Sequence, residues 1–309
     1  MSLYGGPAYP LDMTDIVVVG SINADLLLPC ERIPRPGETL HAHARSLVPG
    51  GKGANQAVAA ARLGGSVALI GAVGEDHMGE DALVLLEEAG VDLAGVARVP
   101  GSTGIAVVQV EDSGENAILI EGGANRAMTA DAVRSASSVV GSAAVVVLQG
   151  EIPRDGIEAA ASACTGRLVV NLAPVIPVAA DVLRRADPLV VNEHEGAGAL
   201  KLLGEYAQGD HAVVGCLIEA GVPSVVMTRG AKGALVGRPG VTTEVPAPTV
   251  EVVDTTGAGD AFVGGLAVRL ASGDNLVEAA RYAARVGAFA CRGRGAQPSY
   301  PWAGDTLPG

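Results

Sequence analysis

Residues 15–25 read D-I-V-V-V-G-S-I-N-A-D and set the class of fold that the rest of the chain follows. Ile16 to Val19 are all apolar and β-branched, as in a strand buried on both faces of a parallel sheet. Asn23 and Asp25 follow at its carboxyl end, where open α/β sheets bind their ligands. In extended chain these two side chains share one side and suit the vicinal hydroxyls of a sugar; a polar turn after a strand is the alternative.

Strand and helix patterns alternate along most of the chain after this first strand. The sequence therefore predicts an α/β fold in which helices flank both faces of a mostly parallel central sheet, giving a three-layer sandwich. Further strands are expected at 67–73, 143–148, 168–171, 189–192, 224–228, 234–236 and 250–253. Helices are expected in the Ala-rich stretch after residue 56 and at 79–89, 156–163, 178–185, 211–220, 262–271 and 276–289.

A hairpin interrupts this alternation. Two strand patterns, at 103–111 and 116–121, flank the turn D-S-G-E, and residues 41–48 alternate loosely as a further candidate strand. Because such a hairpin does not fit the strand–helix order, we expect a small antiparallel β lid outside the main sheet.

One domain accounts for residues 14–309, because no linker divides the chain. The lid is expected to be built from two inserted segments, at about 25–50 and 101–124. Residues 1–13 are rich in Gly, Pro and Tyr and are expected to form a loose tail.

The composition excludes several classes of function. With a net charge of −13 over 309 residues, the chain is not expected to bind nucleic acid or an anionic membrane. Its four cysteines are scattered without a C-x-x-C pair, which indicates a cytoplasmic protein rather than a disulfide framework or a zinc site. No apolar run of 18 residues and no N-terminal targeting pattern is present.

The strongest chemical signal lies at residues 253–265, which read V-D-T-T-G-A-G-D-A-F-V-G-G. Gly257, Ala258 and Gly259 leave backbone N–H groups uncovered at the start of a helix, where Thr255 or Thr256 offers a cap. Uncovered N–H groups at a helix N-terminus bind anions. Asp260 beside them suits a base that takes a proton from a hydroxyl attacking phosphorus; a Gly-rich turn that caps a core helix is the alternative.

Three more polar segments follow predicted strands: G-G-K-G-A-N at 50–55, N-E-H-E at 192–195 and T-R-G-A-K-G at 228–233. The first matches neither the Walker pattern nor G-x-G-x-x-G, and its glycines would admit a ligand to the backbone. The second could hold Mg²⁺-bound water or form a helix capping box, and the third could admit a nucleotide. Because all lie at strand exits of one sheet, they can converge with Asp260.

The chain resembles the PfkB-type carbohydrate kinases, and within them the ribokinase group, over nearly its whole length after residue 13. The motifs that carry the resemblance are G-S-I-N-A-D (20–25), P-R-P-G-E-T (34–39), G-G-K-G-A-N-Q-A-V-A (50–59), S-T-G (102–104), G-A-N (123–125), N-E-x-E (192–195), D-T-T-G-A-G-D (254–260) and G-A-Q-P-S (295–299). The resemblance implies ATP-dependent phosphorylation of the 5-hydroxyl of D-ribose, with ATP and Mg²⁺, in a homodimer that pairs through the lids.

The resemblance also implies a role for individual residues. Asp260 would be the catalytic base, and the N–H groups of Gly257, Ala258 and Gly259 would stabilise the transferred phosphoryl group. Ribose would be held by Asn23, Asp25, Gly51, Lys52, Asn55 and Glu151. Mg²⁺ and the phosphates would be organised by Asn192 and Glu195, and the nucleotide would lie along Thr228, Gly230, Gly233 and Gly259.

A monovalent-cation site, usually for K⁺, is implied at Asp254, Thr256, Ala290, Gly293, Gly295 and Ser299, mostly through backbone carbonyls. Two positions depart from the pattern: Gly293 stands where a larger residue is common, and N-L-A-P at 171–174 replaces N-P-A-P. The alternatives are a kinase of another sugar or nucleoside and a non-catalytic sugar-binding regulator. A nicotinamide dehydrogenase is disfavoured because G-x-G-x-x-G is missing.

Overall fold

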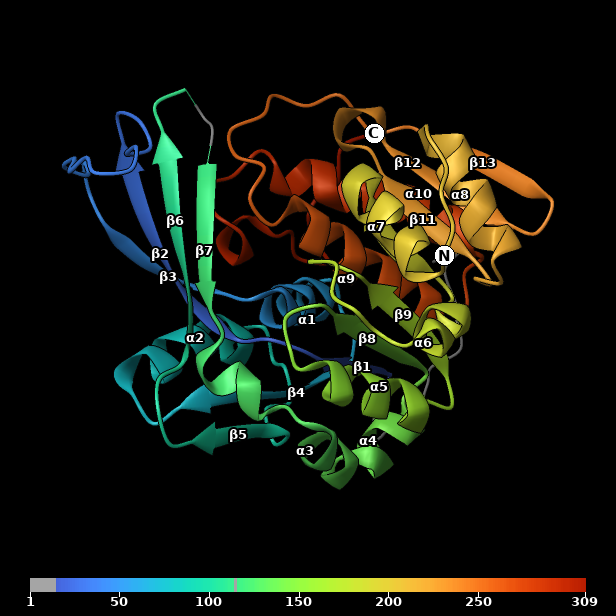
Figure 1. Cartoon of the computed structure of the whole chain (residues 1–309), viewed down its shortest axis with the longest axis horizontal. Coiled ribbons are helices and arrows are strands. Elements are labelled where there is room, and N and C mark those ends of the chain that lie inside the picture. The colour runs from blue at the N-terminus through green and yellow to red at the C-terminus, as the bar shows by residue number, and fades with distance from the viewer. Residues whose placement is uncertain (1–14, 114–115) are drawn as a thin grey trace, which may run out of the picture.

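The computed structural model describes residues 15–113 and 116–309, and its largest element is a nine-stranded sheet (Figure 1). The strands lie in the order β13-β12-β11-β10-β9-β8-β1-β4-β5, parallel from β5 to β11 and antiparallel at β12 and β13. The expected tail at 1–13 lies outside the described residues. The strands are β1 (Ile16–Val19), β4 (Val67–Gly74), β5 (Val96–Val99), β8 (Val145–Gln149), β9 (Arg167–Asn171), β10 (Leu189–Asn192), β11 (Val225–Thr228), β12 (Ala234–Arg238) and β13 (Val241–Val245).

Helices cover both faces of this sheet, which confirms the predicted three-layer α/β fold. One face packs against α1 (Lys52–Arg62), α2 (His77–Glu88), α9 (Ala258–Ala271) and α10 (Leu276–Ala290). The other packs against α3 (Ala130–Ser135), α4 (Ser137–Ser142), α5 (Arg154–Ala163), α6 (Ala180–Arg185), α7 (Glu193–Leu202) and α8 (Asp210–Glu219). Within 15–113 and 116–309, no helix combines the length and the apolar character needed to span a bilayer.

Strand β1 explains why its sequence is apolar without interruption. Ile16 and Val18 point into the core under α1 and α9, whereas Val17 and Val19 point into the core on the opposite face. All four side chains are at most 1% exposed. A strand covered by helices on both faces has no solvent-exposed side, so its sequence shows no alternation of apolar and polar residues.

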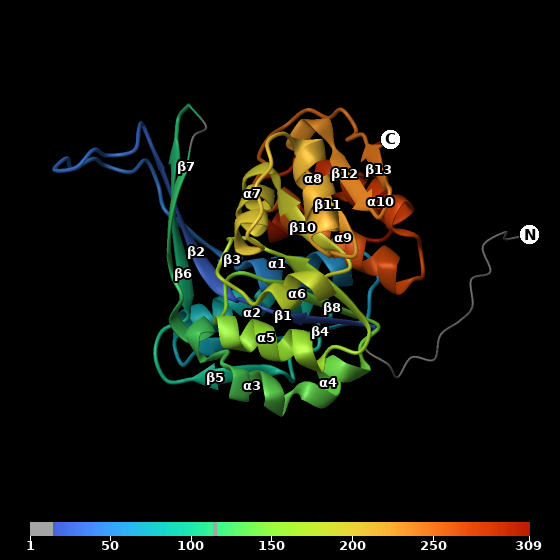
Figure 2. The same ribbon diagram turned by 45° about the vertical axis from the view of Figure 1, so that its right-hand side comes forward.

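A smaller four-stranded sheet stands beside the carboxyl edge of the main sheet, across from α7 and α9 (Figures 1 and 2). Its order is β3-β2-β6-β7, formed by β3 (Ser46–Gly50), β2 (Asn23–Cys30), β6 (Gly104–Glu111) and β7 (Asn116–Glu121). The β6–β7 pairing is antiparallel, as predicted. The β2–β6 pairing is parallel, so the sheet is mixed rather than antiparallel throughout, because both strands leave the main sheet in the same direction.

Several predicted elements differ in the structure. Residues 250–253 form no strand; Val252 and Val253 are 59% and 53% exposed in a loop, and the last strand of the sheet is β13 instead. Strand β3 begins at Ser46 rather than at residue 41, because residues 41–45 are exposed and, among the described residues, form no continuous ladder with β2, to which the His43 N–H alone donates, at the Pro29 carbonyl. Strands β2, β5 and β13 and helices α3 and α4 were not predicted from the sequence, and α7 was expected only as the helix of the alternative capping box.

The helices α1 and α9 pack at unusually short range, and their contact positions the site. A Cβ atom on Gly264 of α9 would lie 2.5 Å from Ala59 Cβ and 2.9 Å from Ala60 N, both on α1. Only a glycine allows this approach. Both helices begin at the carboxyl edge of the sheet, so their first turns meet there.

Candidate active site

Asp260 lies in the first turn of α9, directly after a turn that requires glycine. Gly257 has a φ of 72°, and a Cβ there would collide with the Tyr300 hydroxyl. Among the described residues, the N–H groups of Gly257 and Gly259 have no acceptor, whereas that of Ala258 donates to the Thr255 carbonyl over 3.2 Å. Two of the three predicted anion-binding donors are therefore available, and the third must exchange its partner.

Neither threonine caps α9 as the sequence suggested. The N-cap is Gly257, and it makes no side-chain cap hydrogen bond. Instead the Thr256 hydroxyl donates to Asp254 Oδ1 over 2.7 Å. The first turn therefore has no side chain among the described residues that caps its N–H groups.

The Asp260 carboxylate is buried and receives one hydrogen bond on each oxygen. Asn55 Nδ2 donates to Oδ2 and Gln56 Nε2 donates to Oδ1, both over 2.9 Å. Asp260 is 7% exposed, so these amides are its main solvation. Because both donors are neutral, they orient the carboxylate without pairing it with a cation, and a lone pair stays free for a hydroxyl proton.

Lys52, the first residue of α1, brings a positive charge into a group of acidic side chains. The carboxyl group of Asp260 has the largest effect in raising the pKa of Lys52, and Glu151, Glu195 and Asp25 act in the same direction against the effect of burial. The ammonium group therefore stays charged and partly balances the acidic side chains around it.

Asp25 is the most strongly perturbed acid of the site. Burial, followed by the charges of Glu151 and Asp260, raises the pKa of Asp25 to about 7. Its Oδ1 atom is buried without a hydrogen-bond partner among the described residues. A buried carboxyl group with an unused acceptor suits a ligand that brings its own donor, such as a hydroxyl.

Asn23 and Glu151 are partly engaged by the protein. Asn23 Oδ1 accepts a hydrogen bond from Asn125 Nδ2 over 2.8 Å, so its amide nitrogen is the side-chain atom left without a partner among the described residues. Glu151 Oε2 accepts from the Ser21 hydroxyl over 2.6 Å and from the Lys52 N–H over 3.0 Å. Glu151 thus holds the start of α1 against the exit of β1, which places Lys52.

The glycines at the start of α1 serve a different purpose from the one expected. A Cβ on Gly51 would lie 2.8 Å from Asn23 N, and one on Gly53 would lie 2.6 Å from Ser21 N. They make room for the chain at residues 20–23 rather than for a ligand alone. The close packing brings Asn55 toward Asp260 and Lys52 toward Asp25.

Asn192 and Glu195 form the capping box that was the alternative to a metal role. Asn192 Oδ1 accepts from the Glu195 N–H and Glu195 Oε2 accepts from the Asn192 N–H, both over 2.8 Å. Burial raises the pKa of Glu195, which also lies within the electrostatic range of Lys52 and Asp260. Glu195 Oε1 takes no part in the box and is the atom left for water bound to a metal.

The segment after β11 turns sharply beside the predicted nucleotide path. Gly230 and Gly233 have φ values of 54° and 83°. Thr228 donates its hydroxyl to the Val191 carbonyl over 3.4 Å, which ties the segment to the end of β10. The strand exits that carry Thr228 and Asn192 are therefore adjacent.

The residues predicted to bind a monovalent cation are brought together from two loops. Asp254 Oδ1 accepts from the Thr256 N–H over 2.9 Å, and Asp254 Oδ2 accepts from the Gly295 N–H over 2.8 Å. Burial opposes ionisation, but these hydrogen bonds outweigh it and lower the pKa of Asp254. A Cβ on Gly293 would lie 2.8 Å from Ser299 Cβ, so glycine suits this tighter loop.

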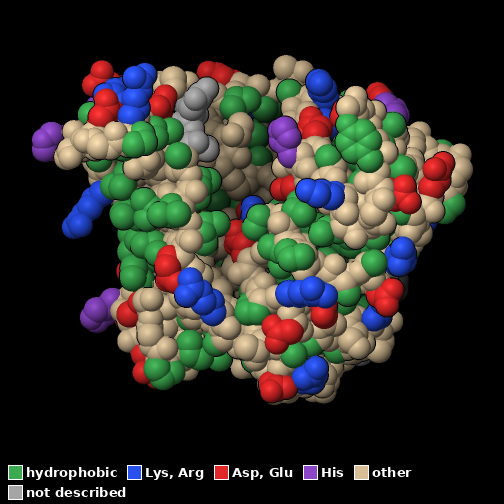
Figure 3. Space-filling view, viewed as in Figure 1, with side chains coloured by type: hydrophobic (Ala, Val, Ile, Leu, Met, Phe, Trp, Pro, Cys, Tyr) green, Lys and Arg blue, Asp and Glu red, His purple; other side chains and the backbone are tan. Residues whose placement is uncertain are grey.

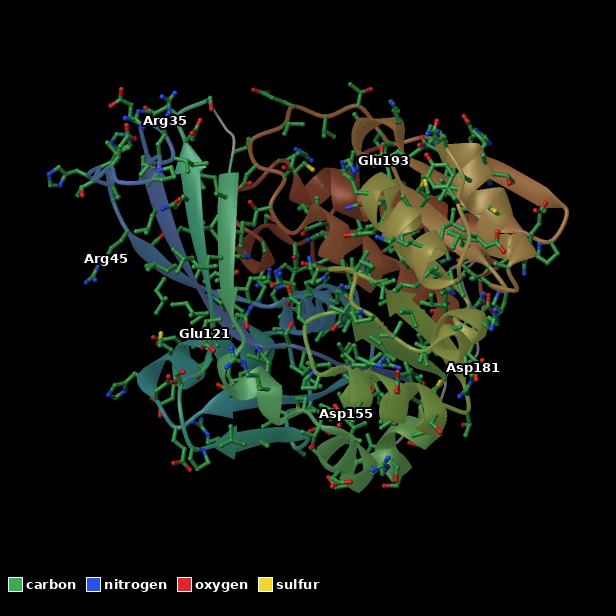
Figure 4. The ribbon with its side chains drawn as sticks, viewed as in Figure 1. Arg35, Arg45, Glu121, Asp155, Asp181 and Glu193 are labelled. Carbon is green, nitrogen blue, oxygen red and sulfur yellow. The ribbon has the colours of Figure 1, made fainter. Side chains whose placement is uncertain are left out.

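Figure 3 shows a hollow between the smaller sheet and the larger body, with basic and acidic side chains visible on its floor. In Figure 4, Glu121 lies at the base of β7 and Glu193 at the start of α7, on opposite sides of this hollow, whereas Arg35 lies at the outer end of the smaller sheet and Arg45 on its left-hand margin. Two cavities, of about 320 and 420 Å³, lie elsewhere along α3, and neither contains a predicted site residue.

Four buried amides near the site were not singled out in the sequence, although three lie inside quoted motifs. They are Gln56, Asn125, Gln149 and Gln297, all at most 2% exposed. A polar residue on the buried side of an Ala-rich helix was the available signal for Gln56. Gln149 ends an apolar strand without any such signal.

The sequence pattern of the pfkB family carbohydrate kinases matches residues 13–303, which is most of the chain. The chain therefore belongs to the PfkB family of carbohydrate kinases. The site described above, with an acid at a glycine-rich helix start, lies inside the matched region.

The relatives narrow this class to its ribokinase group. The ribokinase of Haemophilus influenzae is 35% identical over 299 residues, covering 94% of this chain and 97% of the relative. The mouse ribokinase is 34% identical over 327 residues, covering 99% and 98%. A deoxyribokinase of Salmonella typhi is 33% identical over 292 residues, covering 93% and 95%.

Solved structures confirm the fold. The ribokinase of Thermotoga maritima has a TM-score of 0.87 at 31% identity, covering 94% of this chain and 97% of its own. The ribokinase of Arabidopsis thaliana, solved with ribose and ATP, has a TM-score of 0.84 at 32% identity, covering 94% and 96%.

The raised pKa of Asp25 predicts a specific dependence of stability on pH. An aspartate in the unfolded chain ionises near pH ~4, whereas folded Asp25 keeps its proton until its pKa of about 7. The free energy of unfolding should therefore lose a contribution as the pH rises from about 4 to 7. In urea unfolding, Asp25→Asn should gain stability relative to the parent protein across this interval and level off above it.

Asp131→Asn is the matched control, because the Asp131 side chain is 94% exposed. It should give no gain over the same interval. A constant difference between Asp25→Asn and the parent protein at all pH values would contradict the raised pKa.

Proposed function

We propose that this chain transfers the γ-phosphoryl group of ATP to the 5-hydroxyl of D-ribose and releases D-ribose 5-phosphate. Membership of the PfkB family and 35% identity to a ribokinase support this proposal. The observation that carries it is the position of Asp260, a buried carboxylate beside uncovered N–H groups at the start of α9. Such a pairing suits phosphoryl transfer to a hydroxyl and has no use in a passive sugar-binding protein.

Asp260 accepts the proton of the 5-hydroxyl as its oxygen attacks the γ-phosphorus. Negative charge spreads over the transferred group, and the N–H groups of Gly257 and Gly259 compensate for it. Ala258 joins them when its N–H leaves the Thr255 carbonyl. Transfer of this kind needs alignment and charge compensation more than covalent help from the protein.

The sugar is bound in part by a polar atom that the fold leaves unused, Asp25 Oδ1, and by the donors of Lys52. Asn23, Asn55 and Glu151, which also hydrogen-bond within the protein, and the backbone at Gly51 complete the set. The smaller sheet, formed from segments at about 25–50 and 101–124, acts as the lid of a single domain at 14–309. By covering the sugar it excludes water as a competing acceptor.

The nucleotide lies along Thr228, Gly230 and Gly233, with its phosphates toward Gly259. Mg²⁺ bound to the phosphates would supply charge neutralisation, and Glu195 Oε1 with Asn192 would hold its water. Among residues 15–113 and 116–309, no three His, Cys, Asp or Glu side chains converge as a metal cage. A cation held mainly by phosphates and water fits that arrangement.

A monovalent cation, K⁺, is proposed for the loops at 254–256 and 290–299. The Asp254 carboxylate and the carbonyl groups of Thr256, Ala290, Gly293, Gly295 and Ser299 give an all-oxygen set that suits a hard cation. Bound there, the cation would stiffen the loop that precedes Gly257.

The four unpaired cysteines and the use of ATP fit a cytoplasmic location.

A homodimer through the lids is supported by an apolar row on the smaller sheet. Leu47, Leu26, Val107 and Leu119 lie side by side across its four strands, on the face opposite Asp25. Leu47 is 41% and Leu119 is 74% exposed. An exposed apolar row that crosses a whole sheet is typical of an interface between protein chains.

A substrate panel tests the function directly. With saturating MgATP, D-ribose should give the highest kcat/KM, and each missing hydroxyl that the site binds should cost about 10²-fold or more. 2-Deoxy-D-ribose, D-fructose and nucleosides complete the panel, assayed once in K⁺ and once in Na⁺. Higher activity with 2-deoxy-D-ribose would assign the activity of the Salmonella relative instead, and no ADP release with any sugar would leave a binding protein.

Asp260→Asn tests the base. We expect kcat to fall by about 10²- to 10⁴-fold, because proton transfer is lost while shape is kept. The dissociation constants of sugar and nucleotide, measured by calorimetry, should change little. Asp181→Asn is the control, since the Asp181 side chain is 92% exposed on α6 and lies far from the hollow in Figure 4. A nearly normal kcat in Asp260→Asn would remove this residue from the mechanism.

Leu119→Asp tests the homodimer. Sedimentation should show twice the mass of one chain for the parent protein and a single-chain mass for the variant. Val241→Asp is the control, because Val241 is 54% exposed but lies on β13 in the main sheet. A monomeric parent protein, or a Leu119→Asp variant that stays dimeric, would contradict pairing through this row.

A further inference from the structure

Buried side-chain amides form a connected network around Asp260. Its members come from four elements of the fold and are at most 8% exposed: Asn55 and Gln56 on α1, Gln149 on β8, Asn171 on β9 and Gln297 in the short helix at 297–299. Two of them, Gln149 and Asn171, end the adjacent strands β8 and β9 at the same register position. Burying polar groups of this kind destabilises the fold unless they form hydrogen bonds. The presence of five such amides around one carboxylate therefore indicates a specific role.

Gln56 is the centre of one arm of this network. Its Nε2 donates to Asp260 Oδ1 and to Asn171 Oδ1, both over 2.9 Å, which uses both of its hydrogens. Its Oε1 accepts from Gln149 Nε2 over 2.8 Å. Every hydrogen-bonding group of the Gln56 amide therefore has a partner.

The direction of these hydrogen bonds is fixed by the backbone. Asn171 Nδ2 donates to the Val190 carbonyl over 3.2 Å, so Asn171 Oδ1 must face Gln56. A rotated Gln56 amide would set its oxygen against the oxygens of Asp260 and Asn171. The amide group consequently has one stable orientation, with its N–H toward the carboxylate.

The second arm is shorter. Asn55 Nδ2 donates to Asp260 Oδ2, and Asn55 Oδ1 accepts from Gln297 Nε2 over 2.9 Å. Each oxygen of Asp260 thus receives a neutral donor that another amide holds in place. Two donors on opposite oxygens fix the plane of a carboxylate, which one donor cannot do.

We propose that Gln56, held by Gln149 and Asn171, is a positioning residue that fixes the plane of the Asp260 carboxylate for proton transfer. This inference rests on the proposed phosphoryl transfer. Gln56 does not contact the sugar; it acts through Asp260, whose free lone pair must point at the hydroxyl. Loss of that alignment lowers kcat and leaves the affinity for sugar and nucleotide in place.

The test compares Gln56→Leu with the parent protein. We expect kcat to fall by about 10- to 100-fold, as for other misalignments of a catalytic group, while the dissociation constants of D-ribose and of the ATP analogue AMP-PNP stay within about threefold. Val58→Ala is the control for lost stability, because Val58 is fully buried on the same helix and absent from the network. It should lower Tm without lowering kcat.

Gln149→Met provides a second measurement if Gln56→Leu fails to fold. It removes only the bond that holds Gln56 Oε1, so a smaller loss of kcat is expected, about 3- to 10-fold, again without loss of affinity. An unchanged kcat, or a fall explained by weaker sugar binding, would overturn the proposal in either variant. If the parent protein phosphorylates no sugar at all, the proposed function fails instead.

Discussion

The contact between α1 and α9 is the constraint on which the site depends. Gly264 lets the two helices approach so closely that Asn55 and Gln56 reach the Asp260 carboxylate. The parallel sheet determines where both helices begin, because each of them starts at the carboxyl edge of the sheet. A side chain at position 264 would separate the Asp260 carboxylate from both of its amide donors, Asn55 and Gln56.

The electrostatic arrangement of the site follows from the same packing. Lys52 stands among Asp260, Glu151, Glu195 and Asp25, and among the described residues its positive charge is the cationic charge that acts to lower the pKa of Asp25. An excess of carboxyl groups suits a neutral sugar with hydroxyl donors, and it makes an unaccompanied polyphosphate unfavourable. The N–H groups at the start of α9 supply the positive end that a phosphoryl group needs.

The sequence predicted the architecture well where a physical pattern was local. The uninterrupted apolar run at Ile16–Val19 reported a strand with two buried faces, and the structure divides its side chains between two cores. The hairpin at 103–121 was visible for a similar reason. The position of β2 was not, because its pairing with β6 depends on where two distant segments leave the main sheet.

The candidate site could be predicted only in part. Asp260 and its glycines indicate chemistry only in combination with the other polar segments at strand exits, and the motifs together identify the family. The roles of Gln56 and Asn125 could not be predicted, since an amide in a sequence does not disclose its hydrogen-bond partners. For Asn192 and Glu195 the sequence allowed two interpretations, because their spacing fits both a metal site and a capping box. The folded structure identifies the capping box.

Strand β2 follows β1 after a few residues, so the smaller sheet begins as a continuation of strand β1 of the larger one. Asp25 lies in strand β2 of the smaller sheet, whereas Asp260 lies in helix α9, which packs on the main sheet. The carboxyl groups of Asp25 and Asp260 therefore belong to two parts of the fold that are joined through the short connection at residues 20–22. A change in the length or stiffness of this connection would alter the distance between the proposed sugar contact and the proposed base without altering either residue.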